Sequence, residues 1–120
     1  AGAAFPVKTA QNQIEVGGKT TEFHVSVFAD KVLVIISQNG KPGTVTHTQR
    51  ARGLGGGART FETRVLLGKR DDIVMVYAKR VAEVVAQKTD KPLILTLCLL
   101  DESPEVFKQV MQGLAGVAIW

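Results

Sequence analysis

The sequence is poor in cysteine, in long apolar runs and in aromatic residues near its basic segments. Cys98 is the one cysteine among 120 residues, so no internal disulfide can form and we expect a reducing compartment. The longest apolar runs, VLVII and LILTLCLL, are far shorter than the roughly 20 residues of a membrane-spanning helix. We therefore expect no membrane partner.

The beginning of the sequence, AGAAFP, lacks the basic segment and apolar stretch of a secretory signal. We expect a cytoplasmic protein, with the nucleus as a second compartment. The length and the 45% hydrophobic content predict a single domain over residues 1–120. Within it, residues 1–6 are expected to be flexible and residues 50–60 to form a mobile loop.

Groups that carry chemistry are scarce. His24 and His47 are the only histidines, too few for a zinc site, which usually needs three or four suitable ligands. Cys98 lies in the apolar run LTLCLL, where we expect a small buried side chain rather than a reactive thiolate. Each adjacent acidic pair, at 71–72 and 101–102, precedes a predicted helix and is explained by capping. We predict no catalytic residue, no metal, no cofactor and no enzymatic activity.

The segment RARGLGGGAR, residues 50–59, raises a specific question about nucleotide binding. Gly53, Gly55 and Ala58 fit the G-x-G-x-x-A spacing of a dinucleotide loop. Such a loop must open a helix, whose N-terminus binds the pyrophosphate, whereas this one leads into TFETRVLLG, a predicted strand. A Walker loop fails as well, because Arg70 follows Gly68-Lys69 where Ser or Thr is required. We interpret the segment as a loop between two strands.

A net charge of +4 permits an acidic partner without requiring one. The basic residues around the glycine-rich segment can line one edge and attract phosphates; they are Arg50, Arg52, Arg59, Arg64, Lys69 and Arg70. Phe61 is the only ring close to them, and single-strand binding usually adds stacking rings. A nucleic-acid-binding module therefore remains the alternative function, and a solvated edge or a site for an acidic protein surface is the simpler interpretation.

The first 70 residues predict strands and the rest predicts mostly helices. In TEFHVSVF, residues 21–28, apolar and polar residues alternate, as in a strand with one buried face. Strands are also predicted over 7–16, 32–38, 44–49 and 60–68, with turns at GGK and NGKPGT. The run LILTLCLL, residues 93–100, is typical of a strand covered on both faces.

Two helices follow from apolar residues at helical spacing. The first runs from about Ile73 to Lys88, with Asp71 and Asp72 at its start. The second begins with Ser103 as N-cap and Pro104 in the first helical position. The predicted fold is α+β: a mainly antiparallel sheet of about six strands with two main helices in the C-terminal half.

The order of these features resembles the proteasome assembly chaperone 3 family. The resemblance rests on FADKVLVIISQNGKPGTV, TRVLLGKRDDIVMVYAKRVAEVV, LILTLCLLD and the final Trp120. Its most specific pieces are the pattern Gln38-x-Gly40-Lys41-x-Gly43-Thr44 and the run Val65-Leu66-Leu67-Gly68. It implies a non-enzymatic chaperone that binds α-type subunits transiently while the proteasome α-ring is built. It also implies a homodimer, or a heterodimer with a related small assembly chaperone.

From this resemblance and the basic loop we name candidate partner-binding residues. They are Gln38, Gly40, Lys41, Gly43, Thr44, Arg50, Arg52 and Arg59. The printed sequence ends Ala118-Ile119-Trp120, which does not match the hydrophobic-Tyr-X motif of some other proteasome chaperones, so that binding mode is not assigned. Trp120 has two open interpretations: it folds back onto the core, or it anchors a partner.

Overall fold

The computed structural model describes residues 8–38, 43–51, 60–68, 71–100 and 102–120. Their elements run in the order β1 (Lys8–Val16), β2 (Lys19–Val27), β3 (Val32–Gln38), β4 (Thr44–Ala51), β5 (Thr60–Leu67), α1 (Asp72–Ala86), β6 (Leu93–Cys98) and α2 (Pro104–Ala115). This confirms the predicted α+β class, with both helices in the C-terminal half. No helix in the described ranges is long and apolar enough to cross a membrane.

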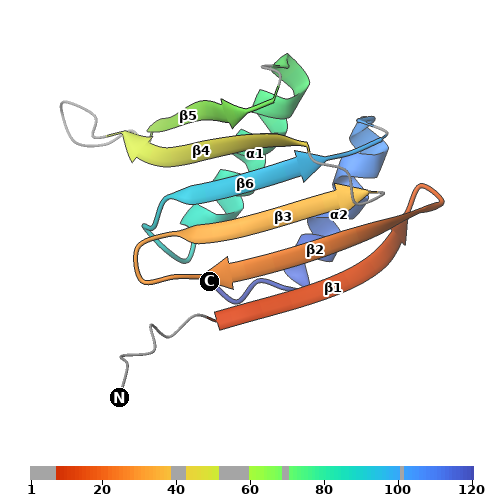
Figure 1. The fold of residues 1–120 in the computed structure, drawn as a ribbon, viewed down its shortest axis with the longest axis horizontal. Coiled ribbons are helices and arrows are strands. Elements are labelled where there is room, and N and C mark those ends of the chain that lie inside the picture. The colour runs from red at the N-terminus through yellow and green to blue at the C-terminus, as the bar shows by residue number, and fades with distance from the viewer. Residues whose placement is uncertain (1–7, 39–42, 52–59, 69–70, 101) are drawn as a thin grey trace.

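The strands form one six-stranded sheet in the order β1-β2-β3-β6-β4-β5 (Figure 1). Only the β3–β6 pairing is parallel. The chain leaves β5, passes through α1 and inserts β6 between β3 and β4. The sheet is therefore mainly antiparallel, and β3 and β6 lie at its centre.

The turn at GGK and the two helix caps take the predicted roles, whereas most of the predicted turn NGKPGT and residues 1–6 lie outside the described residues. Gly17 and Gly18 join β1 to β2 with φ of 60° and 77°, the left-handed backbone of a two-residue hairpin. The Asp71 carboxylate accepts a hydrogen bond from the Ile73 N–H at the start of α1, and Ser103 caps α2 ahead of Pro104. These local signals fix where both helices begin.

Both helices pack on the same face of the sheet. Helix α1 covers β4, β5 and β6, while α2 covers β1 and β2. The core between the layers includes Phe23, Val34, Ile36, Leu95 and Val81, each at most 1% exposed. Gly113 of α2 permits this packing, because a Cβ there would lie 2.7 Å from the Phe23 ring.

Candidate protein-binding interface

The opposite face of the sheet carries no helix or strand among the described residues, and we call it the open face. Figure 1 is viewed onto this face, with α1 and α2 behind the strands. Successive side chains of a strand point to opposite faces. The residues between the buried core positions therefore lie on the open face.

The centre of the open face is apolar. Leu33 pairs with Ile94 across β3 and β6, and Ile35 and Val45 both pair with Thr96 of β6. These five residues, four of them apolar and the fifth Thr96, form what we call the central stripe and are half-buried. They lie side by side on the three adjacent strands β3, β6 and β4. A soluble sheet normally places polar residues on a face that stays in water.

The expectation that residues 93–100 are covered on both faces is met on one face only. Leu93, Leu95 and Leu97 are buried beneath the helices, whereas Ile94, Thr96 and Cys98 between them are only partly buried. The correction includes Cys98, expected to be buried. The apolar run therefore places apolar side chains on both faces of the sheet, whereas the helices cover one face. No described helix or strand covers the central stripe on the other face.

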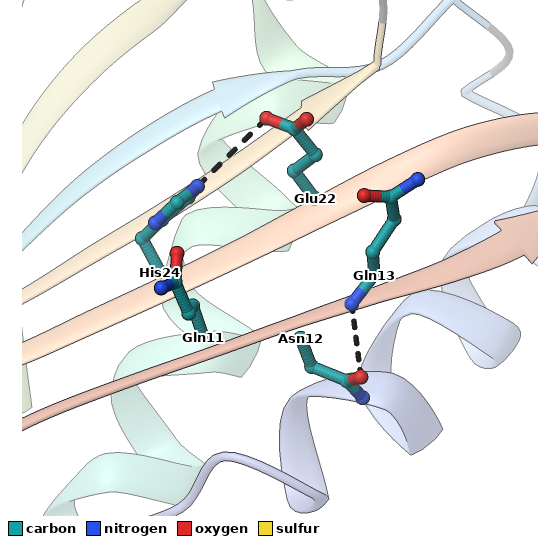
Figure 2. Close-up of a pocket in the computed structure, with 5 residues that line it drawn as sticks. All are labelled: Gln11, Asn12, Gln13, Glu22 and His24. Atoms are coloured by element: carbon teal, nitrogen blue, oxygen red, sulfur yellow. Dashed lines mark hydrogen bonds and ion pairs between the residues drawn. The ribbon is translucent and has the colours of Figure 1, made fainter.

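The flank of the open face on β1 and β2 is polar. Gln11, Gln13, Glu22 and His24 line a shallow hollow of about 430 Å³, together with Asn12 (Figure 2). His24 Nε2 lies 3.8 Å from Glu22 Oε2, and the two side chains are 44% and 48% exposed. An exposed pair at this distance is a weak interaction. The hollow therefore resembles the polar rim of a protein–protein interface more than a catalytic site.

The two histidines cannot share a metal ion. His24 belongs to β2 and His47 to β4, and β3 and β6 lie between them. Three strand spacings separate them by about 14 Å. In the described part of the chain, no three His, Cys, Asp or Glu residues come together as a possible metal site.

The opposite flank, on edge strand β5, mixes charge with an exposed apolar residue. Leu67 is 65% exposed and pairs with Val45 beyond a β-bulge, so it extends the apolar surface to the edge of the sheet. Glu62 and Arg64 are exposed on the same strand. Charged side chains on an edge strand discourage pairing with another chain's edge. Of these two parts of the sheet, the open face is better suited than the β5 edge to contact another protein.

Gln38 and Gly43, both expected to bind a partner, instead make contacts within the fold. Gln38 is fully buried: its Nε2 donates to Thr21 Oγ1, and its Oε1 accepts from the Leu100 N–H. A Cβ on Gly43 would overlap the Leu97 carbonyl oxygen, so only glycine fits against β6 there. Thr44 is partly buried and pairs with Leu97. Gln38 and Gly43 therefore shape the ends of β3 and β4.

Four candidate residues lie outside the described ranges: Gly40, Lys41, Arg52 and Arg59. The segment 50–59 does join two strands, as interpreted from the sequence, because β4 ends at Ala51 and pairs antiparallel with β5 from Thr60. Arg50, expected in the mobile loop, belongs to β4.

Arg50 ties β4 to the end of α1. Its Nη2 donates to the Ala86 carbonyl oxygen at 2.7 Å, and its Nη1 lies 2.6 Å from Asp90 Oδ1. The last turn of α1 contains no basic residue of its own. A cation that binds an unpaired terminal carbonyl stabilises the negative end of the helix dipole. Arg50 is therefore occupied within the fold.

We expect Arg50→Ala to lower the free energy of unfolding by about 1–2 kcal/mol, because the Ala86 carbonyl loses its charged donor. Asp90→Ala should cost less than about 0.5 kcal/mol, since Asp90 is 86% exposed. Urea unfolding of both variants, with exposed Arg64→Ala as the matched control, measures the difference. Equal effects of Arg50→Ala and Arg64→Ala would contradict the assigned role.

At the end of the sheet where α1 begins, Asp71, Cys98 and Glu102 line a hollow of about 320 Å³. Burial, with a smaller contribution from the Asp71 charge, raises the pKa of Glu102. Asp71 is already used as the cap of α1. The Cys98 thiol makes only a weak contact, at 4.0 Å, with the Gln38 carbonyl oxygen. These groups lack the nucleophile–base geometry of a catalytic site.

Trp120 folds back onto the core, the first of the two interpretations left open by the sequence. Its partly buried ring packs against the hydrophobic core, as does Ile119. The indole Nε1 is buried and finds no hydrogen-bond partner among the described residues. In this conformation the ring holds the segment after α2 against the core.

The central stripe is not among the residues expected from the sequence to bind a partner. Its signal lies in the two runs VLVIISQ and LILTLCLL, which are apolar at successive positions. A strand with one wet face alternates, whereas these two carry apolar residues on both faces. Because both helices of the described residues lie on one face of the sheet, two such strands leave an apolar surface on the other face.

Comparison with known proteins finds a matching family model and several relatives, all with the same family description. The family model for proteasome assembly chaperone 3 matches residues 34–117. The chain is 29% identical over 112 residues to proteasome assembly chaperone 3 of Bos taurus, covering 92% of each protein. It is 28% identical over 117 residues to that of Nematostella vectensis, covering 89% of this chain and 86% of the relative.

The fold is also similar to that of a solved protein. A chain in the crystal structure of a novel chaperone complex for yeast 20S proteasome assembly superposes with a TM-score of 0.72. The match covers 91% of this chain and 97% of the other, at 16% identity. At that identity, the likeness concerns the fold alone.

Proposed function

The chain belongs to the proteasome assembly chaperone 3 family, and we propose that it is a non-enzymatic chaperone that works as a dimer. In this proposal the dimer binds α-type subunits transiently while the α-ring of the proteasome core particle is built. The observation that carries the proposal is the open face, with its apolar central stripe and polar flank. An apolar centre within a polar rim is the anatomy of a protein–protein interface.

The open face gives the dimer a physical form. Two sheets can pack face to face about 10 Å apart, with their inner side chains interdigitating. The helices already cover the other face, so the dimer places them outside. The second sheet comes from another copy or from a related small assembly chaperone. The latter is supported by the similar fold found in a chaperone complex.

The basic loop has a narrower proposed role than the sequence suggested. Arg50 is held by Ala86 and Asp90, so charge reversal there would disturb the fold. Arg52→Glu with Arg59→Glu is the cleaner test of whether the loop speeds encounter with an acidic surface.

The nucleic-acid alternative is weakened by the structure. Arg50 is used within the fold and Arg64 shares its strand with the acidic Glu62, so neither adds freely to a basic patch. We propose a cytoplasmic location, with the nucleus as a second compartment.

Affinity purification of the tagged chain from its own cells, with nuclease treatment, tests the proposed function. We expect mass spectrometry to find immature α-type proteasome subunits, with or without a related small partner. Nuclease-sensitive ribonucleoproteins in their place, with no proteasome subunits, would favour the nucleic-acid alternative and contradict the proposal.

A further inference from the structure

A second apolar surface lies between α1 and α2, in a groove of about 410 Å³. Helix α1 lines it with Ile73, Val76, Tyr77 and Arg80, which share one side of the helix at the spacing i, i+3, i+4 and i+7. Val76 is 55% exposed. A large apolar side chain exposed beside an apolar groove marks a surface that a partner can cover.

Helix α2 lines the facing side with the same spacing. Pro104, Phe107, Lys108 and Met111 are the residues that it contributes. Seven residues of helix rise about 10 Å, so each lining stripe spans two helical turns. The groove is long enough for two turns of a third helix.

The floor of the groove is held in place. The rings of Tyr77 and Phe107 stack with centroids 3.8 Å apart and planes within 3°. The Tyr77 hydroxyl also donates to the Glu102 carbonyl oxygen. The two residues are 5% and 8% exposed, so they provide a flat floor rather than mobile side chains. A preformed floor lowers the entropic cost of binding.

The charges at the groove are positive. Arg80 and Lys108, one on each helix, are exposed, and we call them the basic rim. No carboxylate is among the described lining residues. Glu83 approaches Arg80 at 3.4 Å, but both side chains face solvent, so this pair is weak and can open. The charge complement of the basic rim is a partner with carboxylates on both sides of an apolar ridge.

We propose that the groove between α1 and α2 binds a short, acidic amphipathic helix of a partner protein. A helix satisfies its own backbone hydrogen bonds, whereas an extended segment on this apolar floor would leave backbone groups unpaired. The inference rests on the proposed function in one respect: the open face accommodates the second sheet of the dimer, so this groove stays free on the outside. It gives the dimer a surface for a client distinct from its own interface.

A fluorescein-labelled, lactam-bridged helical peptide tests the groove. The peptide carries Leu at positions i and i+4 and Glu on both sides, and a second peptide has Lys in place of Glu. We expect the Glu peptide to bind in fluorescence anisotropy. Arg80→Glu with Lys108→Glu should weaken it about tenfold, the size expected for two rim ion pairs, and favour the Lys peptide. Val76→Thr should weaken both peptides.

Lys79→Glu with Lys88→Glu is the matched control, because both lysines are exposed and lie outside the groove lining. Equal weakening by this control, or no binding of the Glu peptide, would overturn the inference. Binding of wild type to phosphatidylserine vesicles in preference to the Glu peptide would also overturn it. The dimer mass and the capture of α-type subunits are measured in separate experiments. If the peptide does not bind the groove, those two measurements still test the proposed function. If they fail, the peptide measurement still tests the groove.

Discussion

Ile35→Thr combined with Ile94→Thr is expected to convert the proposed dimer into a folded monomer. Both residues lie in the central stripe on the open face. In a two-fold dimer the pair of substitutions acts twice, so four isoleucines are lost. Each is already half-buried in the single chain, so burying the rest of its side chain contributes about 1 kcal/mol, a part of the roughly 1.5–3 kcal/mol of full burial. Several kcal/mol in total predict a dissociation constant raised at least about 100-fold. Sedimentation equilibrium of the chain, alone and with a related small chaperone if one co-purifies with it, measures the change.

The monomer should tolerate these two substitutions. Both side chains are already partly exposed in the single chain, and threonine keeps the branched Cβ that suits a strand. Gln11→Thr with Gln13→Thr is the matched control, since it places the same residue twice on the polar flank of the same face. A double isoleucine variant that dimerises like wild type, or a control that dissociates equally, would contradict the assignment of the dimer surface.

Gly43→Ala is expected to be among the most destabilising small substitutions in the chain. The added Cβ would overlap the Leu97 carbonyl oxygen and lie 2.7 Å from the Cβ of Cys98. Leu97 and Cys98 belong to β6, which pairs on both sides at the centre of the sheet, so the backbone cannot easily give way. We expect the free energy of unfolding to fall by about 3 kcal/mol.

Gly116→Ala is the matched control for the Gly43 variant. Gly116 follows α2 with φ of −71°, and an added Cβ there would lie no closer than 3.3 Å to its neighbours. Its effect should stay within about 0.5 kcal/mol. Urea unfolding of the two variants gives the comparison. A Gly43→Ala protein as stable as Gly116→Ala would contradict the close packing assigned to Gly43.

Much of the fold could be predicted because its signals are local. Alternation in residues 21–28 predicts a strand with one buried face, and β2 has that burial pattern. Asp71, Ser103 and Pro104 mark the helix starts through hydrogen bonds within a few residues. Such features depend on neighbours in the sequence, so the sequence displays them directly.

The candidate site was harder to predict because it depends on contacts between distant segments. The insertion of β6 between β3 and β4 brings Ile35, Val45 and Ile94 together, and no local pattern specifies that order. Arg50 was interpreted as a loop residue because its partners, Ala86 and Asp90, lie far along the chain. No residue near Gly43 in the sequence indicates that the Leu97 backbone lies against it.

Protection of the open face in the proposed dimer can be measured directly by thiol labelling. Thr96→Cys, in a Cys98→Ser background, places a thiol in the central stripe, and Gln112→Cys in the same background places one on exposed α2. We expect maleimide to react at least about tenfold more slowly with the first thiol in the dimer than after dilution to monomer, and to react equally with the second thiol in both states. Equal reactivity of the first thiol in dimer and monomer would show that the open face is not the surface that joins the two subunits.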